Sequence, residues 1–314
     1  MSVPRNTETS VPRNTETSAP LSGYRALVTG AYGTLGTAIC RRLRADGANL
    51  LLVGRSAARL QELATTLAAE SVSEDGASGG LETLAVDLAA TDAVDAIVSA
   101  VEAGGGLDLL VNNAAIQGPI GPLWENDWDA WQETIRLDLL VPVALCRALV
   151  GAGRLGRDGR RGKIVNISGG GATGPRPNFS AYGVAKAALV RFTETFAHEV
   201  RERNIDINAI APGVIASQMT QAILAAGDTR AGGNEAATAR KAIAGDGAAQ
   251  DKAAALVGWL ASAASDGVTG RLLAALWDPW PTLDQRVAEL AATDIYTLRR
   301  IVPEDRGRRW DVRE

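Results

Sequence analysis

From Tyr24 onward, the chain alternates short, continuous apolar runs with longer segments of helical periodicity. Continuous apolar runs of this length are typical of strands buried on both faces of a parallel sheet. In one of the helix-length segments between them, Leu35, Ile39 and Leu43 share a face. Gly47 follows that segment, where a helix would end. The alternation predicts a doubly wound α/β fold, in which ligands bind beyond the carboxyl ends of the strands. The seven runs are YRALVT, ANLLLVG, ETLAVDL, LDLLVNN, KIVNIS, DINAIAP and GRLLAAL.

Composition restricts the class of protein and of partner. With 314 residues, of which 46% are hydrophobic and 22% charged, the chain is expected to be soluble and globular. Its net charge of −4 predicts neither a nucleic-acid nor a membrane partner. Cys40 and Cys146 lie in apolar, helix-like contexts, which favours free thiols and a cytoplasmic location. His198 is the only histidine, so no metal site built on several imidazoles is expected.

The first twenty residues contain a tandem copy of VPRNTETS, at 3–10 and again at 11–18. The segment is polar and has no apolar stretch that would serve as a signal peptide or a membrane span. Such a composition buries too little surface to offset the entropy of ordering. Residues 1–20 are therefore predicted to be a disordered tail outside the fold.

The first apolar run leads into TGAYGTLG at 29–36. A strand that turns through glycines into a helix presents backbone N–H groups at the positive end of the helix dipole, which suits a pyrophosphate. The alternative is that the glycines serve only tight packing between strand and helix. The second run ends at Gly54 and Arg55, without the acidic residue that would bind the ribose hydroxyls of NAD. Arg55 favours a 2′-phosphate and hence NADP(H), unless it is a solvated arginine in a turn.

Tyr182 and Lys186 lie four residues apart in YGVAK, shortly after the fifth run. If a helix begins just before Tyr182, both side chains lie on one face, and the ammonium approaches the phenol. A free tyrosine has a pKa of about 10, too high for a base at neutral pH, and a neighbouring cation favours the phenolate. The pair therefore predicts a general acid/base centre. The alternative is an aromatic residue at a helix start and a surface lysine.

Five landmarks, in their order and spacing, resemble the short-chain dehydrogenase/reductase family. They are TGAYGTLG, VDL at 86–88, NNAA at 112–115, YGVAK and APG at 211–213, and the resemblance covers roughly residues 22 to 276. It implies a seven-stranded Rossmann-type sheet in a single domain, with residues 21–276 as the family domain and 277–314 as a C-terminal extension. It further implies hydride transfer between a nicotinamide cofactor and a small secondary alcohol or ketone, in a homodimer or homotetramer. NADP(H) is the preferred cofactor, and NAD(H) remains open.

The resemblance also implies roles for individual residues. Tyr182 is the acid/base, Lys186 tunes it and binds the nicotinamide ribose, and Ser168 orients the substrate oxygen. Asn112 is also placed beside the cofactor ribose. The implied cofactor-binding residues are Gly30, Tyr32, Gly33, Thr34, Leu35, Gly36, Arg55, Asp87, Leu88, Asn113, Ala114, Ala115, Tyr182, Lys186, Pro212, Gly213, Ile215 and Ser217.

The chain departs from the family pattern in the catalytic region. The family's serine precedes the tyrosine by thirteen positions, which is Gly169 here, one residue after Ser168. Adjacent strand residues face opposite ways, so Ser168 serves only if the strand has ended or bulged there; Ser180 and Thr173 are weaker candidates. Asp138 replaces the asparagine that steadies a proton-relay water.

The glycine spacing T-G-x-x-G-x-x-G is common in the extended branch of the family, which contains sugar-nucleotide epimerases and dehydratases. Such an enzyme therefore remains an alternative function. The shifted serine and Asp138 leave a second alternative, a non-catalytic NADP(H)-binding redox sensor.

Aromatic residues mark two further regions. In the C-terminal extension, a helix is expected around 284–292. Trp277, Trp280, Trp310 and Tyr296 are expected to anchor the extension on the body, with a share in the substrate pocket or in a subunit interface as the alternative. Three further tryptophans follow the fourth run, at Trp124, Trp128 and Trp131. Helix packing is the expected role of these three, with a sugar-stacking platform as the alternative.

Overall fold

The computed structural model describes residues 19–70 and 80–310, and all structural statements refer to these. Residues 1–18 of the expected N-terminal tail lie outside the described residues. Seven parallel strands form one sheet in the order β3-β2-β1-β4-β5-β6-β7. The strands are β1 (Arg25–Thr29), β2 (Asn49–Gly54), β3 (Leu81–Ala85), β4 (Leu109–Asn112), β5 (Gly162–Ile167), β6 (Ile205–Ala211) and β7 (Leu272–Ala274). Each contains or overlaps one of the seven apolar runs, so the predicted doubly wound α/β fold is confirmed.

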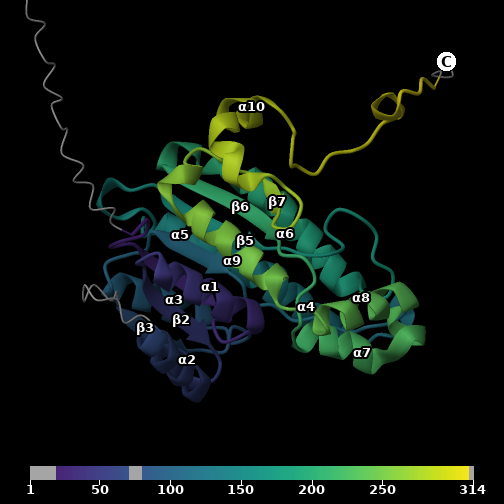
Figure 1. The fold of residues 1–314 in the computed structure, drawn as a ribbon, viewed down its shortest axis with the longest axis horizontal. Coiled ribbons are helices and arrows are strands. Elements are labelled where there is room, and N and C mark those ends of the chain that lie inside the picture. Colours follow the sequence, from purple (N-terminus) through teal and green to yellow (C-terminus); the bar gives the residue numbers. More distant parts are fainter. Residues whose placement is uncertain (1–18, 71–79, 311–314) are drawn as a thin grey trace, which may run out of the picture.

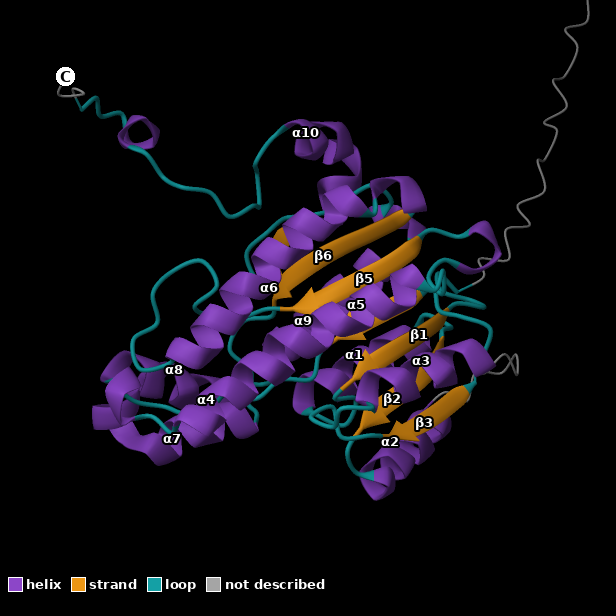
Figure 2. Cartoon of the chain, turned by 180° about the vertical axis from the view of Figure 1, so that it is seen from behind, coloured by secondary structure: helices purple, strands orange, loops and turns teal. Residues whose placement is uncertain are grey.

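Helices cover both faces of the sheet, as Figures 1 and 2 show from opposite sides. Successive strand residues point to opposite faces. Val28 of β1 therefore packs in one core cluster, while its neighbour Leu27 packs in the other. The first cluster lies under α1 (Thr34–Ala45), α2 (Ala57–Glu70) and α9 (Ala248–Ala261). The second lies under α3 (Ala93–Ala103), α5 (Val141–Gly151) and α6 (Ser180–Glu199).

Three further helices lie near the carboxyl ends of the strands. They are α4 (Trp128–Ile135), α7 (Gln218–Ala231) and α8 (Gly233–Ile243). The α7–α8 pair follows β6 and protrudes from the end of the sheet beside α4 (Figures 1 and 2). Three-residue 3-10 turns occur at Leu123–Glu125, Arg157–Gly159, Arg201–Arg203 and Ala263–Ser265.

Two details of the secondary structure refine the expectations from the sequence. The first helix ends as predicted: α1 is followed by Gly47, whose φ of +94° a residue with a side chain rarely adopts. The expectation of burial on both faces is wrong for β3. Glu82, Thr83 and Ala85 of that strand are exposed. This strand lies at an edge of the sheet, where α2 packs on it.

The C-terminal extension packs against the body in its first half. A 3-10 segment (Trp280–Arg286) precedes α10 (Val287–Ala292), so the expected helix around 284–292 is α-helical only from Val287. Trp280 and Tyr296 pack against the core cluster that contains Val28, as expected of anchors. Trp277 and Trp310 are 73% and 71% exposed, so their expected anchoring role is wrong.

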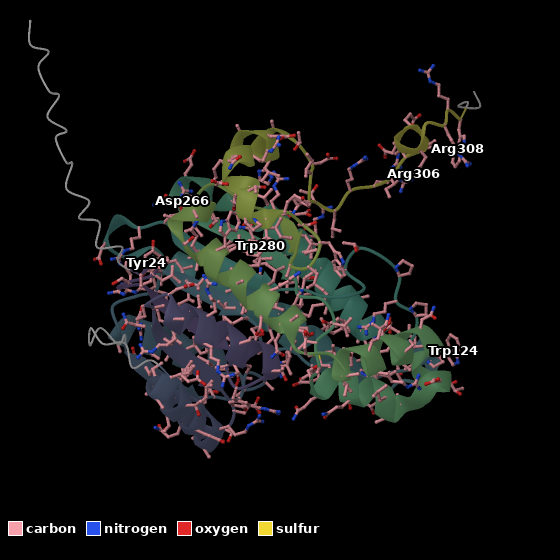
Figure 3. All side chains as sticks on the ribbon, viewed as in Figure 1. Tyr24, Trp124, Asp266, Trp280, Arg306 and Arg308 are labelled. Atoms are coloured by element: carbon pink, nitrogen blue, oxygen red, sulfur yellow. The ribbon has the colours of Figure 1, made fainter. Side chains whose placement is uncertain are left out.

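The end of the chain leaves the body. Its last described turn is Pro303–Arg306, and Figure 3 labels Arg306 and Arg308 on this projecting segment, away from Trp280. Within the described ranges, no helix is long and apolar enough to cross a membrane.

The tryptophans after β4 do not fill the core. Trp124 and Trp128 are 86% and 58% exposed, whereas Trp131 is half-buried and donates its indole N–H to Ser180 Oγ. Trp128 stacks on Trp131 with ring centroids 4.9 Å apart. The expected packing role therefore fits Trp131 alone.

Candidate active site

The glycine turn after β1 has the shape that a pyrophosphate site requires. Gly30 has a φ of +64°, and a Cβ atom on Gly36 would overlap the Gly30 carbonyl oxygen. Gly33 caps α1 without a side-chain hydrogen bond, and the first turn of α1 has no acidic residue. The first N–H groups of a helix have no acceptor within the helix. The first N–H groups of α1 are therefore available to an anion, and the turn fits the pyrophosphate that the sequence predicts.

The ends of β1 and β4 are joined beside this turn. The Asn113 amide donates to the carbonyl oxygens of Thr29 (2.9 Å) and Gly30 (3.2 Å). Thr29 Oγ1 accepts the backbone N–H groups of Asn113 and Ala114, each at 3.0 Å. A Cβ atom on Gly30 would lie only 2.9 Å from Ala114 Cα. The structure therefore brings Gly30, Asn113 and Ala114 together, and Thr29, which the sequence reasoning missed, holds them there.

Two arginines follow β2: Arg55 directly after the strand and Arg59 in the first turn of α2. The Tyr32 hydroxyl accepts the backbone N–H groups of Arg55 (3.1 Å) and Ser56 (3.2 Å), and its ring covers Gly54, where a Cβ atom would lie 2.6 Å away. The guanidinium carbon of Arg59 lies 4.2 Å from the Tyr32 ring centroid. Arg59 was also missed, although its position one helical turn after Arg55 was a signal. Both arginines are exposed beside the glycine turn.

Further predicted cofactor residues follow β3 and β6, whereas Thr34 and Leu35 open α1 and Ala115 follows β4. Asp87 is exposed after β3 and accepts the Ala89 N–H, whereas Leu88 is buried. After β6, Gly213 has a φ of +85°, and a Cβ atom there would lie 2.6 Å from Leu276. Ser217 starts α7 by donating its N–H to Thr220 Oγ1 at 2.7 Å.

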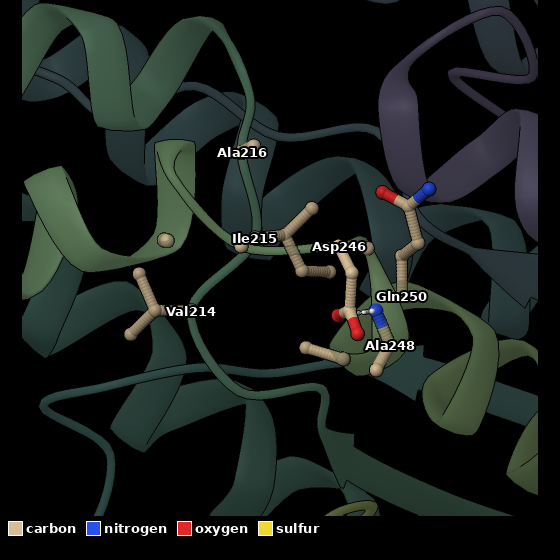
Figure 4. A pocket seen from close by; sticks show the side chains of 10 residues that line it. Val214, Ile215, Ala216, Asp246, Ala248 and Gln250 are labelled. Carbon is tan, nitrogen blue, oxygen red and sulfur yellow. Dashed lines mark hydrogen bonds between the residues drawn. The ribbon is translucent and has the colours of Figure 1, made fainter.

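A hollow of about 100 Å³ lies beside this segment. Val214, Ile215 and Ala216 form one wall (Figure 4). Residues between α8 and the first turn of α9 form the other, with the Asp246 carboxylate accepting the Ala248 N–H at 3.0 Å. Of the predicted cofactor residues, Ile215 is the one that lines this hollow.

Tyr182 and Lys186 lie in the first two turns of α6, as the sequence predicts. The Lys186 ammonium is 5.5 Å from the Tyr182 ring centroid and donates to the Ile167 carbonyl oxygen at 3.1 Å. Both side chains are buried. Burial raises the pKa of Tyr182 above its usual value; Lys186 and Arg176 lower it, and Asp138 raises it further. The net direction is therefore opposite to the one expected from the lysine alone, because removal from water outweighs the cations.

Asp138 contacts Lys186 of this pair from the segment that joins α4 and α5. Residues Arg136–Leu140 form one π-helical turn, a feature frequent at functional sites. Pro142, four residues after Asp138, has no N–H to donate to the Asp138 carbonyl oxygen. The Asp138 carboxylate accepts the Ile116 N–H at 2.8 Å and lies 3.3 Å from the Lys186 ammonium. Burial raises the pKa of Asp138, against the opposing effect of Lys186.

The position of the serine differs from that in the family pattern. β5 ends at Ile167, so the strand has ended before Ser168, as its proposed role requires. Ser168 Oγ is buried and has no hydrogen-bond partner, so it is not bonded to the Tyr182 hydroxyl. Gly169 lies against that hydroxyl, because a Cβ atom built on Gly169 would overlap it. Of the weaker candidates, Ser180 binds Trp131 and Thr173 is exposed.

The described residues contain no group of three or more His, Cys, Asp or Glu side chains placed to hold a metal ion. His198 is exposed on α6, and Cys40 and Cys146 are buried free thiols. The assembled features are thus a glycine turn of a shape that fits a pyrophosphate, two exposed arginines beside it and a buried Tyr–Lys–Asp cluster. All lie at or beyond the carboxyl ends of the strands, where doubly wound sheets bind ligands.

Comparison with known proteins identifies the family. The family model described as short chain dehydrogenase matches residues 24–227. The short chain dehydrogenase/reductase astE of Aspergillus oryzae is 36% identical over 258 residues, which are 81% of this chain and 94% of that protein. Gluconate 5-dehydrogenase of Gluconobacter oxydans is 33% identical over 209 residues, which are 65% of this chain and 76% of that enzyme.

Solved structures agree with this assignment. A Beutenbergia cavernae protein, described as an NAD(P)-dependent gluconate 5-dehydrogenase and crystallised with NADP at low occupancy, has a TM-score of 0.68 and 30% identity. The match covers 82% of this chain and 97% of that one. The chain therefore belongs to the short-chain dehydrogenase/reductase family and is an NAD(P)-dependent oxidoreductase of alcohols and ketones.

Proposed function

We propose that the chain prefers NADP(H) and interconverts a small secondary alcohol and its ketone with Tyr182 as the general acid/base. The observation that carries the catalytic part is the buried Tyr182–Lys186 pair at the carboxyl end of β5. The nicotinamide supplies or accepts the hydride. In reduction, the Tyr182 hydroxyl donates its proton to the carbonyl oxygen of the substrate. In oxidation, the phenolate takes the proton of the alcohol.

The other polar residues of the cluster have supporting roles in this proposal. Lys186 favours the phenolate through its charge and binds the nicotinamide ribose. Asp138 holds Lys186 and positions the relay water. Ser168 orients the substrate oxygen. Its hydroxyl is buried without a hydrogen-bond partner, which supports a role in binding a polar group of the substrate.

The proposed preference for NADP(H) rests on the two arginines that follow β2. Arg55 and Arg59 lie beside Tyr32, and the strand end offers no carboxylate for the ribose 2′-hydroxyl. A guanidinium binds a phosphate strongly and bidentately. The relative that was crystallised with NADP is compatible with this preference.

The remaining assignments are proposals of the same standing. We place the enzyme in the cytoplasm, as a homodimer or homotetramer. We take residues 21–276 as the family domain and the residues from 277 onward as its extension. The glycine turn, the β4 end and the segment after β6 form the cofactor site that the sequence predicts.

Turnover of NADPH with a panel of alcohols and ketones tests the proposed function. Tyr182→Phe is expected to bind the cofactor as the parent does and to lose turnover by a factor on the order of a hundred or more. Tyr296→Phe, a substitution of the same type in the C-terminal extension, is the control and is expected to keep parental turnover. Cofactor binding without turnover of any panel member would instead support the redox sensor.

A further inference from the structure

The loop after β5 is tied to α8 by a partly buried ion pair. The Arg176 guanidinium donates to both carboxylate oxygens of Glu235, with Nε at 3.0 Å and Nη2 at 2.8 Å. The Arg176 side chain is 15% exposed and that of Glu235 is 32% exposed. Paired hydrogen bonds of this kind fix the orientation of the guanidinium as well as its distance. The α7–α8 pair therefore carries the group that holds Arg176 in place.

Two aromatic rings complete the surroundings of the guanidinium. Its central carbon lies 4.0 Å from the Phe179 ring centroid and 5.5 Å from that of Tyr182. Phe179 is fully buried and packs with Ile223 of α7 and Ala239 of α8. The same helical pair thus buries Phe179 and supplies Glu235, and both contact Arg176.

We propose that Arg176 is a positioning residue of the catalytic centre, held against Tyr182 by Glu235 when the α7–α8 pair is docked. The proposal rests on the function proposed for Tyr182. In this proposal, Arg176 lies beside the Tyr182 phenol as a second cation because α7 and α8 pack against the loop.

The charges around Tyr182 give the expected direction of the effect. Lys186 from α6 and Arg176 from the loop lower the pKa of the phenol, whereas Asp138 from the π turn raises it. Glu235 of α8 contacts Arg176 on this side of the site. Loss of the guanidinium leaves one cation against Asp138, so the Tyr182 pKa rises. We expect a rise of about half a pH unit or more, since Glu235 already offsets part of the charge.

A titration that needs no substrate tests the proposal. The chain has four tyrosines, so ¹³C labelling of the tyrosine Cζ gives four resonances, and Tyr182→Phe identifies the one of interest. In Arg176→Gln, the Tyr182 phenolate signal should begin at higher pH than in the parent. Arg176→Lys, which retains the charge, should recover part of the shift. In alcohol oxidation, the acid limb of kcat/KM should move by the same amount.

Arg230→Gln is the matched control. Arg230 also ties α7 to the body, through the Ile120 carbonyl oxygen at 2.7 Å and Glu125 at 3.5 Å, but it does not contact Tyr182. This variant should leave the Tyr182 titration unchanged. An equal shift in both variants, or none in Arg176→Gln, would overturn the proposal.

The Glu235→Ala variant shows whether Glu235 holds the Arg176 guanidinium in place or only offsets its charge. If Glu235 holds Arg176 in place, the freed guanidinium leaves the phenol and the Tyr182 pKa rises, as in Arg176→Gln. A lower pKa would mean that the guanidinium stays without Glu235, which refutes the holding role. Because the resonance reports on Tyr182 alone, an absence of turnover in the parent would count against the proposed function and not against the positioning role.

Discussion

Replacing Asp138 by asparagine removes one negative charge from the catalytic cluster and keeps the shape of the side chain. The asparagine side chain has almost the same volume and retains an oxygen to accept the Ile116 N–H, which now binds the carboxylate at 2.8 Å. It cannot neutralise the Lys186 ammonium, which lies 3.3 Å from the Asp138 carboxylate. The substitution therefore exposes Tyr182 to a larger share of the lysine charge.

The geometry sets the size of the effect. A unit charge at the distance of 5.5 Å between the Lys186 ammonium and the Tyr182 ring centroid contributes about 3 kcal/mol at an effective dielectric constant of about 20, or about two pKa units. If Asp138 cancels about half of this field, Asp138→Asn lowers the pKa of Tyr182 by about one unit. Asp138 itself raises that pKa, so the direction is downward.

The pH dependence of alcohol oxidation measures this change. Oxidation uses the phenolate, so the rate rises with pH through the Tyr182 pKa, which burial places above its ordinary value. In Asp138→Asn, the rise begins at lower pH, and at a fixed pH below the parental pKa the rate increases about tenfold. The exposed carboxylate of Asp129 on α4 offers a control, because Asp129→Asn should leave the profile unchanged. An unshifted profile for Asp138→Asn, or a shift to higher pH, would refute the reasoning.

Three further outcomes are expected. Arg55→Ala weakens NADP(H) binding and leaves NAD(H) binding nearly unchanged, because only the former has a 2′-phosphate; equal weakening in titrations of both cofactors would make Arg55 a bystander. Gly169→Ala places a methyl group against the Tyr182 hydroxyl and lowers turnover about tenfold or more with cofactor affinity retained, and full activity would show that the ring moves freely. Arg271→Met leaves the carbonyl oxygens of residues 290, 293 and 295 without the guanidinium that they now bind, and destabilises the fold by about 2 to 4 kcal/mol in urea denaturation. Arg286→Gln, at an exposed pair, is its control and should change stability by less than about 1 kcal/mol.

The fold could be predicted from local pattern because strands covered by helices on both faces of a sheet are rich in apolar residues. All seven strands lie in or overlap runs visible in the sequence. Glycines at fixed places after the first run likewise predicted the turn into α1, since Gly30 adopts a φ that other residues avoid. The edge position of β3 was not visible, because exposure depends on which strand lies beside it.

The sequence by itself determined which residues share a turn or a helical face. Tyr182 and Lys186 are four apart on one helix, so helical geometry alone brings them together. Only the tertiary structure decided what surrounds them. Asp138 lies 48 positions before Lys186 in sequence and yet forms an ion pair with it, and Glu235 holds Arg176 across 59 positions. Gly169 rather than Ser168 lies against the phenol, because the direction of a side chain after β5 depends on where the strand ends. Local spacing fixes contacts along one element, whereas contacts between elements depend on how the helices pack on the sheet, which no single segment encodes.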